Sequence, residues 1–317
     1  MRLGKVWLWL WIVLLAGCQE PPLRALKVAT NQWIGYEPLY LARYIGAFEQ
    51  NVDVIQLPSA TDVMRALRNG NVDVAATTLD EALLLASQGE QLVVLMAFDF
   101  SNGADVVLAR PPIASLEEIK GKRVGVENTG LGAVMLSAAL THVGYNAEDV
   151  TLVNLSVDQH EAAYTNNEVD VVVTFEPVAT KLRQAGANVL FDSSAVPDLI
   201  VDVLVARRSA LEQQPAAVID LMAGYYRARH YMSVNPTNAM RFIGKRMQLS
   251  NAELQKAFAG LHLPSLQDNL NWLSGAHSPF DTVSGQLQQL MQARHLLDHS
   301  EHGQLQSGLV WLEKVQP

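Results

Sequence analysis

The stretch NGNVDVAATTLDEA, residues 69–82, returns later in the chain as NNEVDVVVTFEPVA, residues 166–179. The two align without a gap and share the leading asparagine, the Val-Asp-Val run and a threonine. Further upstream, LKVATN at 26–31 has a counterpart in KRVGVEN at 122–128, with the same spacing to within a residue. Two ordered matches indicate an internal duplication, and a period this long is not that of a solenoid. The sequence therefore predicts two similar lobes.

Within each lobe, short β-branched runs alternate with runs of helical period. Strands are expected at 26–30, 52–57, 72–76 and 92–98 in the first lobe, and at 123–126, 151–154, 169–173 and 189–191 in the second. Strands that alternate with helices of this length are typical of parallel sheets, which predicts an α/β fold.

Two further β-branched runs, 105–109 and 199–206, lie outside the repeats. We expect them to be hinge strands, because the chain passes there from one lobe to the other and back. This predicts a first lobe of 26–104 plus 206–317, a second lobe of 105–205, and a ligand cleft between them. After Arg207 the pattern becomes helical, with Pro215 at one helix start and a Ser250-x-x-Glu253 capping box at another. This tail is expected to pack on the first lobe.

The N-terminus is typical of an exported lipoprotein. Residues 6–15 are an unbroken apolar run behind Arg2 and Lys5, too short to span a membrane. The run ends in Leu-Ala-Gly before Cys18, which resembles the bacterial lipobox. We therefore expect residues 1–17 to be a signal peptide, Cys18 to carry lipid and residues 18–25 to be a tether. An uncleaved membrane anchor is the alternative.

Composition excludes several classes of protein. Cys18 is the only cysteine, so a disulfide framework and a thiolate metal site are excluded. Loss of Arg2 and Lys5 with the signal leaves 21 basic against 32 acidic residues, a net charge of −11. This balance argues against binding to nucleic acid or to anionic lipid head groups.

Four segments carry a family resemblance: WIGYEPLYLA at 33–42, residues 67–73, LEEIKGKRVG at 116–125 and Phe-Glu-Pro at 175–177. In their order and spacing the chain resembles the periplasmic binding proteins of nitrate/sulfonate/taurine-type ABC importers, whose relatives include binders of thiamine-pyrimidine precursors. The resemblance spans 26–235. It implies a two-lobe type II periplasmic binding protein fold without a cofactor. The implied partners are a small-molecule ligand, an ABC permease and its ATPase, and we expect a monomer.

Ligand-facing residues are expected at the carboxyl ends of strands and in the hinges, where open α/β sheets bind small molecules. These positions select Asn31, Gln32, Trp33, Tyr36, Ser59, Thr61, Thr77, Thr78, Asp99, Ser101, Asn128, Thr129, Phe175, Glu176 and Asp202. We expect NQWIGYEP, residues 31–38, to form one wall of the cleft and Phe175-Glu176 to face it.

Each of these residues has a structural alternative. Trp33 and Tyr36 are either ligand-stacking residues or ordinary core aromatics. The hydroxyl residues before the helices are either ligand contacts or only helix caps, and a helix N-terminus also attracts anions. Asp202 interrupts an apolar run, so its partner is either the ligand or another part of the protein.

Charge favours one class of ligand. The expected cleft loops contain no lysine or arginine. Seven acids lie in or beside them: Glu37, Asp80, Asp99, Asp105, Glu127, Glu176 and Asp202. Acids and aromatic rings favour a cation through ion pairing and cation–π contact. We therefore predict an amine-bearing, zwitterionic or aminopyrimidine-like ligand, although the family is named for anions. A sulfonate or nitrate held by helix N-termini is the alternative.

An enzyme is the first competing class. Eukaryotic pyrimidine synthases share the implied fold but need a cysteine-rich iron site, which a single cysteine cannot supply. Gly130-x-Gly132 follows a strand, but Met135 replaces the third glycine of a dinucleotide fingerprint. The spacing of His295, His299 and His302 fits a metal-binding helix face, but we expect a solvated helix end and no metal. A ligand-sensing lipoprotein that signals to a membrane receptor is the second competitor.

Overall fold

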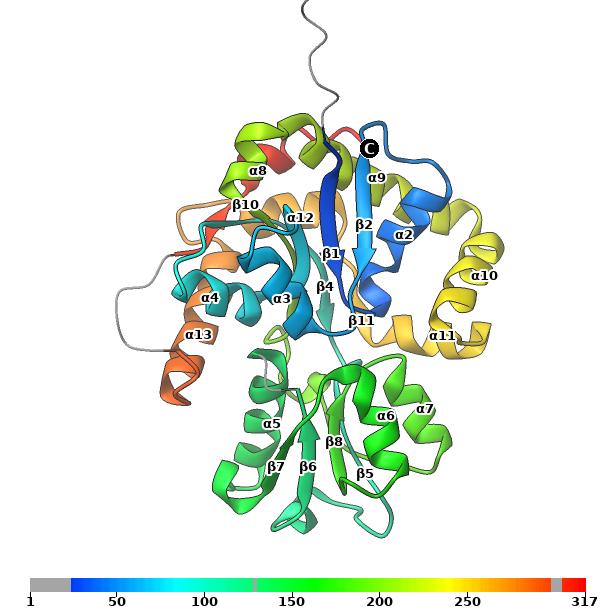
Figure 1. The fold of residues 1–317 in the computed structure, drawn as a ribbon, viewed down its shortest axis with the longest axis vertical. Coiled ribbons are helices and arrows are strands. Elements are labelled where there is room, and N and C mark those ends of the chain that lie inside the picture. The colour runs from blue at the N-terminus through cyan, green and yellow to red at the C-terminus, as the bar shows by residue number, and fades with distance from the viewer. Residues whose placement is uncertain (1–23, 128–129, 298–303) are drawn as a thin grey trace, which may run out of the picture.

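The structure is a computed structural model that describes residues 24–127, 130–297 and 304–317. The predicted signal peptide, the lipid site Cys18, and the candidates Asn128 and Thr129 lie outside the described residues. Figure 1 shows two lobes, each built on its own sheet, with the larger lobe carrying both the first strand and the C-terminal helices. The prediction of a two-lobed α/β fold is confirmed.

The larger sheet has seven strands in the order β11-β4-β10-β3-β1-β2, with β12 paired to β4. Its strands are β1 (Leu26–Thr30), β2 (Val52–Gln56), β3 (Val74–Thr78), β4 (Leu92–Ser101), β10 (Val201–Arg207), β11 (Leu261–His262) and β12 (Gln306–Ser307). The first part of the chain adds η1 (Ile34–Tyr36), α2 (Glu37–Tyr44), α3 (Ala60–Arg68) and α4 (Leu79–Ser87).

The smaller sheet has five strands in the order β7-β6-β8-β5-β9. Its strands are β5 (Val106–Ala109), β6 (Arg123–Val126), β7 (Thr151–Asn154), β8 (Val171–Thr174) and β9 (Asn188–Asp192). Its helices are η2 (Leu116–Ile119), α5 (Gly130–His142), η3 (Ala147–Asp149), α6 (Val157–Thr165), α7 (Val178–Gln184) and η4 (Ser193–Ala195).

The duplication is visible in the topology. In each lobe three parallel strands lie in the order second, first, third, and an antiparallel strand then follows the third. The aspartate of Val-Asp-Val has the same task in both copies. Asp73 accepts the backbone N–H of Lys27 at 3.0 Å, and Asp170 accepts that of Arg123 at 3.0 Å. Each aspartate thus attaches the start of its repeat's third strand to the start of the first.

The two expected hinge strands form, but their place differs from the prediction. Residues 105–109 contain β5, which lies inside the smaller sheet between β8 and β9. Residues 199–206 overlap β10, which lies inside the larger sheet between β3 and β4. The crossings are therefore the segments before these strands, 102–105 and 193–200, and the pairing of β10 assigns residues 201–205 to the larger sheet.

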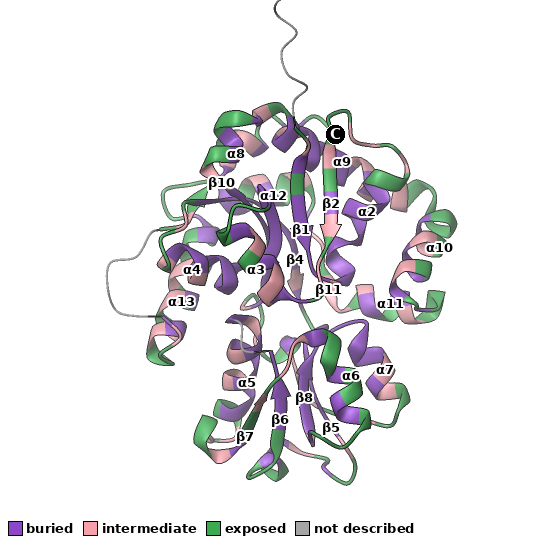
Figure 2. Ribbon diagram, viewed as in Figure 1, coloured by how far each residue is buried: buried purple, intermediate pink, exposed green. Residues whose placement is uncertain are grey.

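The C-terminal helices pack on the larger lobe, as predicted. They are α8 (Arg208–Gln213), α9 (Pro215–Val234), α10 (Pro236–Met247), α11 (Asn251–Ala259), α12 (Leu266–Leu273), α13 (Pro279–Ala293) and α14 (Leu309–Leu312). Pro215 and the Ser250 capping box stand at the predicted helix starts. Figure 2 shows the central strands buried beneath this cover. None of the helices in the described ranges is long and apolar enough to cross a membrane.

Candidate functional site

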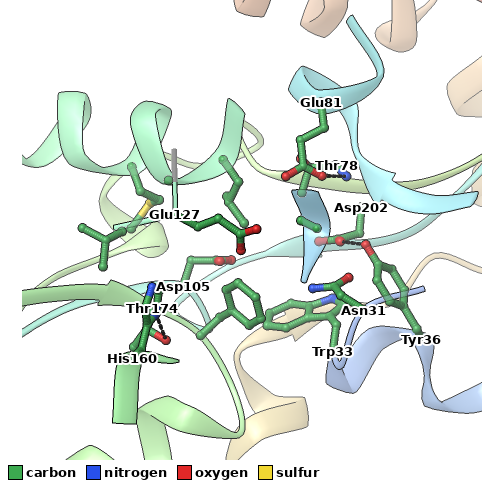
Figure 3. Close-up of a pocket in the computed structure, with 16 residues that line it drawn as sticks. Asn31, Trp33, Tyr36, Thr78, Glu81, Asp105, Glu127, His160, Thr174 and Asp202 are labelled. Atoms are coloured by element: carbon green, nitrogen blue, oxygen red, sulfur yellow. Dashed lines mark hydrogen bonds between the residues drawn. The ribbon is translucent and has the colours of Figure 1, made fainter. Parts of the chain in front are cut away.

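A pocket lies between the two lobes (Figure 3). The carboxyl ends of the parallel strands β1, β3, β6 and β8 all lead into it, which agrees with the rule that predicted the site. It is lined by Asn31, Trp33, Tyr36, Ala60, Thr78, Glu81, Asp105, Glu127, Leu131, Gly132, Met135, His160, Val173, Thr174, Phe175 and Asp202. The space open to the centres of water molecules is only about 30 Å³. A ligand larger than a few atoms therefore requires the lobes to separate or side chains to move.

Two buried acids support the loop of residues 31–36, which carries Trp33 and Tyr36 and is called the aromatic loop below. Asp99 on β4 and Asp202 on β10 are direct cross-strand partners, with exposed fractions of 0% and 4%. Trp33 Nε1 donates to Asp99 Oδ2 at 3.1 Å, and the Tyr36 hydroxyl donates to Asp202 Oδ1. The predicted loop thus binds the pair through both of its aromatic side chains. Of the two acids, Asp202 reaches the pocket.

Gly35 lies between these two aromatics because the position has no room for a side chain. A Cβ at this position would overlap the Asp99 carboxylate and crowd Trp33 Nε1. Glycine therefore allows the loop to approach the acid pair closely enough for both hydrogen bonds.

The two lobes touch across the pocket through an aromatic pair and a hydrogen-bonded carboxylate. Trp33 meets Phe175 edge to face, with ring centroids 5.4 Å apart and planes at 88°. Glu127 Oε1 accepts the backbone N–H and the hydroxyl of Thr61 at 3.0 and 2.6 Å. Helix α5 begins against the larger lobe, where a Cβ at Gly130 would overlap the Asp80 carboxylate.

The pocket is acidic. Among the described lining residues there are four acids, Glu81, Asp105, Glu127 and Asp202, and no lysine or arginine. Burial raises the pKa of Asp105 to about 7, and burial and the charge of Asp99 raise that of Asp202 well above its usual range. Burial likewise raises the pKa of Asp99 to about 8. Without a cation, these groups hold protons near neutral pH.

His160 does not supply the missing positive charge. It is buried, with Nδ1 3.2 Å from Thr174 Oγ1 and Nε2 3.2 Å from the Leu155 carbonyl oxygen. Burial lowers the pKa of His160 to about 4, so the imidazole is neutral at physiological pH. It then donates from Nε2 to the carbonyl and accepts the Thr174 hydroxyl at Nδ1.

Of the fifteen ligand candidates taken from the sequence, those that line the pocket are Asn31, Trp33, Tyr36, Thr78, Phe175 and Asp202. Gln32 is not among its lining residues. Asp99 lies behind Trp33, and the Ser101 hydroxyl meets that of Ser193 at 2.8 Å. Glu176 is bound within its own lobe, to Arg183 at 2.7 Å and to the backbone N–H of Thr180 at 3.0 Å. Phe175 therefore faces the aromatic loop, and Glu176 does not.

The hydroxyl candidates before the helices have mostly structural roles. Ser59 caps α3 by accepting the Asp62 backbone N–H at 3.1 Å. The Thr77 hydroxyl donates to Glu81, and Thr61 bonds Glu127 of the other lobe.

Sequence reasoning missed other lining residues. Glu127 directly follows a predicted strand and Asp105 begins one, but the sequence marks them only as acids in or beside the cleft loops, and Glu81 lies in the first turn of a helix. The remainder are Leu131, Gly132, Met135, His160, Val173 and Thr174, together with Ala60, which lies between the candidates Ser59 and Thr61. The first three belong to the first turns of α5, a position that a strand-end rule does not select.

The comparisons with known proteins agree with this geometry. A family model described as "NMT1/THI5 like" matches residues 33–239. The taurine-binding periplasmic protein of Escherichia coli K12 is 26% identical over 202 residues, 62% of this chain and 63% of that protein. The chain thus spans less than two thirds of this relative's length.

Solved structures show the same fold. The alkanesulfonate-binding protein SsuA from Xanthomonas axonopodis pv. citri, bound to MOPS, superposes with a TM-score of 0.72 at 17% identity, covering 88% of this chain and 96% of that one. A ligand-binding component of an ABC-type import system from Staphylococcus aureus superposes with a TM-score of 0.76 at 13% identity, covering 92% and 99%. The predicted periplasmic binding protein fold is confirmed, and the names are those of binding proteins, as expected, and not of enzymes.

Proposed function

The chain belongs to the NMT1/THI5-like family, and on this premise we propose that it is a lipid-anchored solute-binding protein. It captures a small molecule between its lobes and delivers it, as a monomer, to an ABC permease and its ATPase. The two-lobed fold, the pocket between the lobes and the names of the relatives support this role.

The ligand is amine-bearing, zwitterionic or aminopyrimidine-like. One observation carries this proposal: four buried acids line the pocket, and its described lining contains no lysine or arginine. Burying carboxylates without a cation is unfavourable, and a ligand ammonium supplies the missing charge. Trp33 and Phe175 offer ring surfaces to the same group. Taurine carries an ammonium as well as a sulfonate, so the name of the relative is compatible with this ligand class.

A sulfonate or nitrate ligand is the second candidate, and one observation favours it. Leu131 and Gly132, in the first turn of α5, line the pocket, and Ala60 opens α3 at the opposite wall. Free backbone N–H groups at helix N-termini attract anions.

Thermal melting distinguishes the two candidates. The full chain, purified in a non-ionic detergent, is melted with amines, aminopyrimidines, taurine, alkanesulfonates and nitrate. A ligand at 100-fold its dissociation constant stabilises by about 2.7 kcal/mol, a shift of several degrees. We expect amines to raise the melting temperature, Asp202→Asn to abolish the rise, and the exposed control Asp53→Asn to keep it. Shifts with nitrate and alkanesulfonates alone would contradict the cationic ligand while leaving the binding role intact.

The anchor is tested separately. We propose export to the periplasmic or cell-surface side of the membrane, with lipid on Cys18 and removal of residues 1–17. Labelled palmitate should enter the wild-type chain and not Cys18→Ser. Equal labelling of both would contradict the lipid site, and a retained N-terminus in mass spectrometry would favour the uncleaved anchor.

A further inference from the structure

Helices α2, α9 and α10 lie together at one side of the larger lobe (Figure 1). A second hollow is lined by residues of α2, the end of α9 and α10. We call it the basic groove and define it by Tyr40, Arg43, Tyr44, Arg241, Phe242 and Lys245. Its volume is about 710 Å³, within the range of specific binding sites. It shares no lining residue with the pocket between the lobes.

The basic groove is positively charged in a chain of net charge −9. Arg246 joins Arg43, Arg241 and Lys245 in the lining, which contains no aspartate or glutamate among the described residues. Within the described residues, Arg246 is the only one of the four cations with an ion pair, to Glu37 at 2.8 Å. Arg241 and Lys245 are exposed and have no ion pair in the described part of the chain.

Aromatic rings form the floor and one edge of the groove. The Arg246 guanidinium lies 3.7 Å from the Tyr40 ring centroid, a cation–π contact. Tyr44 stacks on Phe242, with centroids 4.4 Å apart and planes at 23°. Tyr44 is nevertheless 66% exposed, which leaves its outer face in water. Tyrosine, phenylalanine and arginine are enriched in protein interfaces, and tyrosine and arginine among the residues that contribute most binding energy.

Helix dipoles account for part of the charge only. Arg43 is in the last turn of α2, and Lys245 and Arg246 are in the last turn of α10, where cations are favourable. Arg241 lies in the middle of α10, where the helix dipole does not favour a cation. The dipoles also do not explain why cations from two helices converge on an exposed aromatic stack.

We propose that the basic groove binds an acidic, aromatic-bearing segment of a partner protein. The carboxylates of such a segment pair with Arg43, Arg241 and Lys245, and an apolar side chain covers the exposed face of Tyr44. A free anion or a lipid phosphate satisfies the cations but leaves that ring exposed, so the combination favours a peptide.

The test uses the full chain in a non-ionic detergent and the fluorescein-labelled peptide Glu-Glu-Phe-Glu-Glu-Phe. We expect saturable binding that weakens with salt, and binding at least about tenfold weaker for the peptide with glutamine in place of glutamate. The double variant Arg241→Glu/Lys245→Glu should weaken binding by about tenfold or more. Its matched control, Lys122→Glu/Lys256→Glu, reverses two exposed lysines elsewhere and should leave the affinity unchanged.

Tyr44→Ala tests the aromatic half of the proposal. It should weaken the binding of the phenylalanine-containing peptide and leave the binding of a peptide of glutamate and serine unchanged. Absence of saturable peptide binding, or equal binding by the double variant and its control, would overturn the proposal. Flotation with phosphatidylglycerol vesicles that depends on Arg241 and Lys245, without peptide binding, would overturn it in favour of a membrane contact. None of these results depends on the ligand between the lobes.

Discussion

Single residues decide how the acid pair behaves. Asp99 and Asp202 face each other across two antiparallel strands and share the aromatic loop, with Asp105 and Glu81 as further acids and Tyr36 as a donor. Arg229 lowers the pKa of Asp99, but burial outweighs it. Two buried like charges are unfavourable, so the ligand-free protein retains protons on these acids.

We therefore predict that the ligand-free protein is more stable at pH 6.5 than at pH 8.5. The pKa of Asp99 is raised to about 8 and that of Asp105 to about 7, above the unfolded value of 3.8. The stabilisation from their protonation is complete below about pH 4 and is lost as the pH rises through 7 to 8. The melting temperature should fall by on the order of 5 °C between pH 6.5 and 8.5.

The matched variants for this pH dependence are Asp99→Asn and Asp53→Asn. The first replaces a titrating carboxyl by an amide that still accepts from Trp33, and should flatten the profile. The second changes an exposed carboxylate and should not. A profile that is equally steep in Asp99→Asn would contradict a proton held by the pair.

Gly35→Ala should be destabilising. The new methyl group overlaps the Asp99 carboxylate, so the loop or the strand must move and the Trp33 hydrogen bond is lost. We expect a loss of about 1–3 kcal/mol in the free energy of unfolding, measured by urea denaturation. The control is Gly285→Ala in α13, where a Cβ meets nothing within 4 Å and alanine favours the helix. Equal stability of the two variants would show that the loop tolerates a side chain.

At the scale of elements, the repeated Val-Asp-Val motif connects two strands in each sheet. Asp73 accepts the Lys27 backbone N–H and both Arg24 nitrogens, at 2.9 and 2.6 Å. Asp170 makes the equivalent contacts with Arg123 but is more exposed. The same sequence motif thus has two different environments.

We predict that Asp73→Ala lowers the free energy of unfolding by about 1–3 kcal/mol, because it leaves a part-buried N–H and a guanidinium without their acceptor. Asp170→Ala should cost less, since solvent replaces its contacts more readily. Urea denaturation with Asp53→Ala as the surface control measures both. A larger loss for Asp170→Ala would mean that the smaller sheet depends more on this contact than its exposure indicates.

The elements were largely predictable, because periodicity and the duplication are local signals. The third strand of each repeat begins two residues later than predicted, at Val74 and Val171, since the preceding aspartate is used for the contact with the first strand. The crossing strands were predicted as strands but placed wrongly between the lobes. The sheet to which each strand belongs depends on pairing with strands that are distant in the sequence, and a local sequence pattern does not show that pairing.

The site was predictable where it follows the strand-end rule and not elsewhere. Trp33, Tyr36 and Phe175 line the pocket, because their loops leave strands that point there. The strand-end rule places Glu176 in the cleft, but the direction of its side chain depends on Arg183, seven residues further along the chain. His160 carries no signal in the sequence, since it enters the pocket from the side of α6.

At the scale of the whole molecule, the close contact between the lobes depends on small residues at the start of α5. A Cβ at Gly130 would overlap the Asp80 carboxylate, whose pKa burial raises to about 8. We predict that Gly130→Ala separates the lobes, raises the radius of gyration in small-angle scattering, and weakens ligand binding by about tenfold. Gly285→Ala, far from the lobe contact, should change neither quantity. If Gly130→Ala changed neither the radius of gyration nor the affinity, the close approach at Gly130 would not determine how near the two lobes come.

The edge-to-face contact of Trp33 and Phe175 has an optical consequence. The described part of the chain contains three tryptophans, Trp33, Trp272 and Trp311. Of these three, Trp33 alone lines the pocket between the lobes. Its Nε1 is bonded to the Asp99 carboxyl of its own lobe, and the phenyl ring of Phe175 meets it from the other lobe only while the lobes touch. Opening exposes this indole to water, so its emission shifts to longer wavelength and acrylamide quenches it. The molecule thus contains its own fluorescent reporter, and stopped-flow recording of that emission measures the rate at which the lobes close on a ligand.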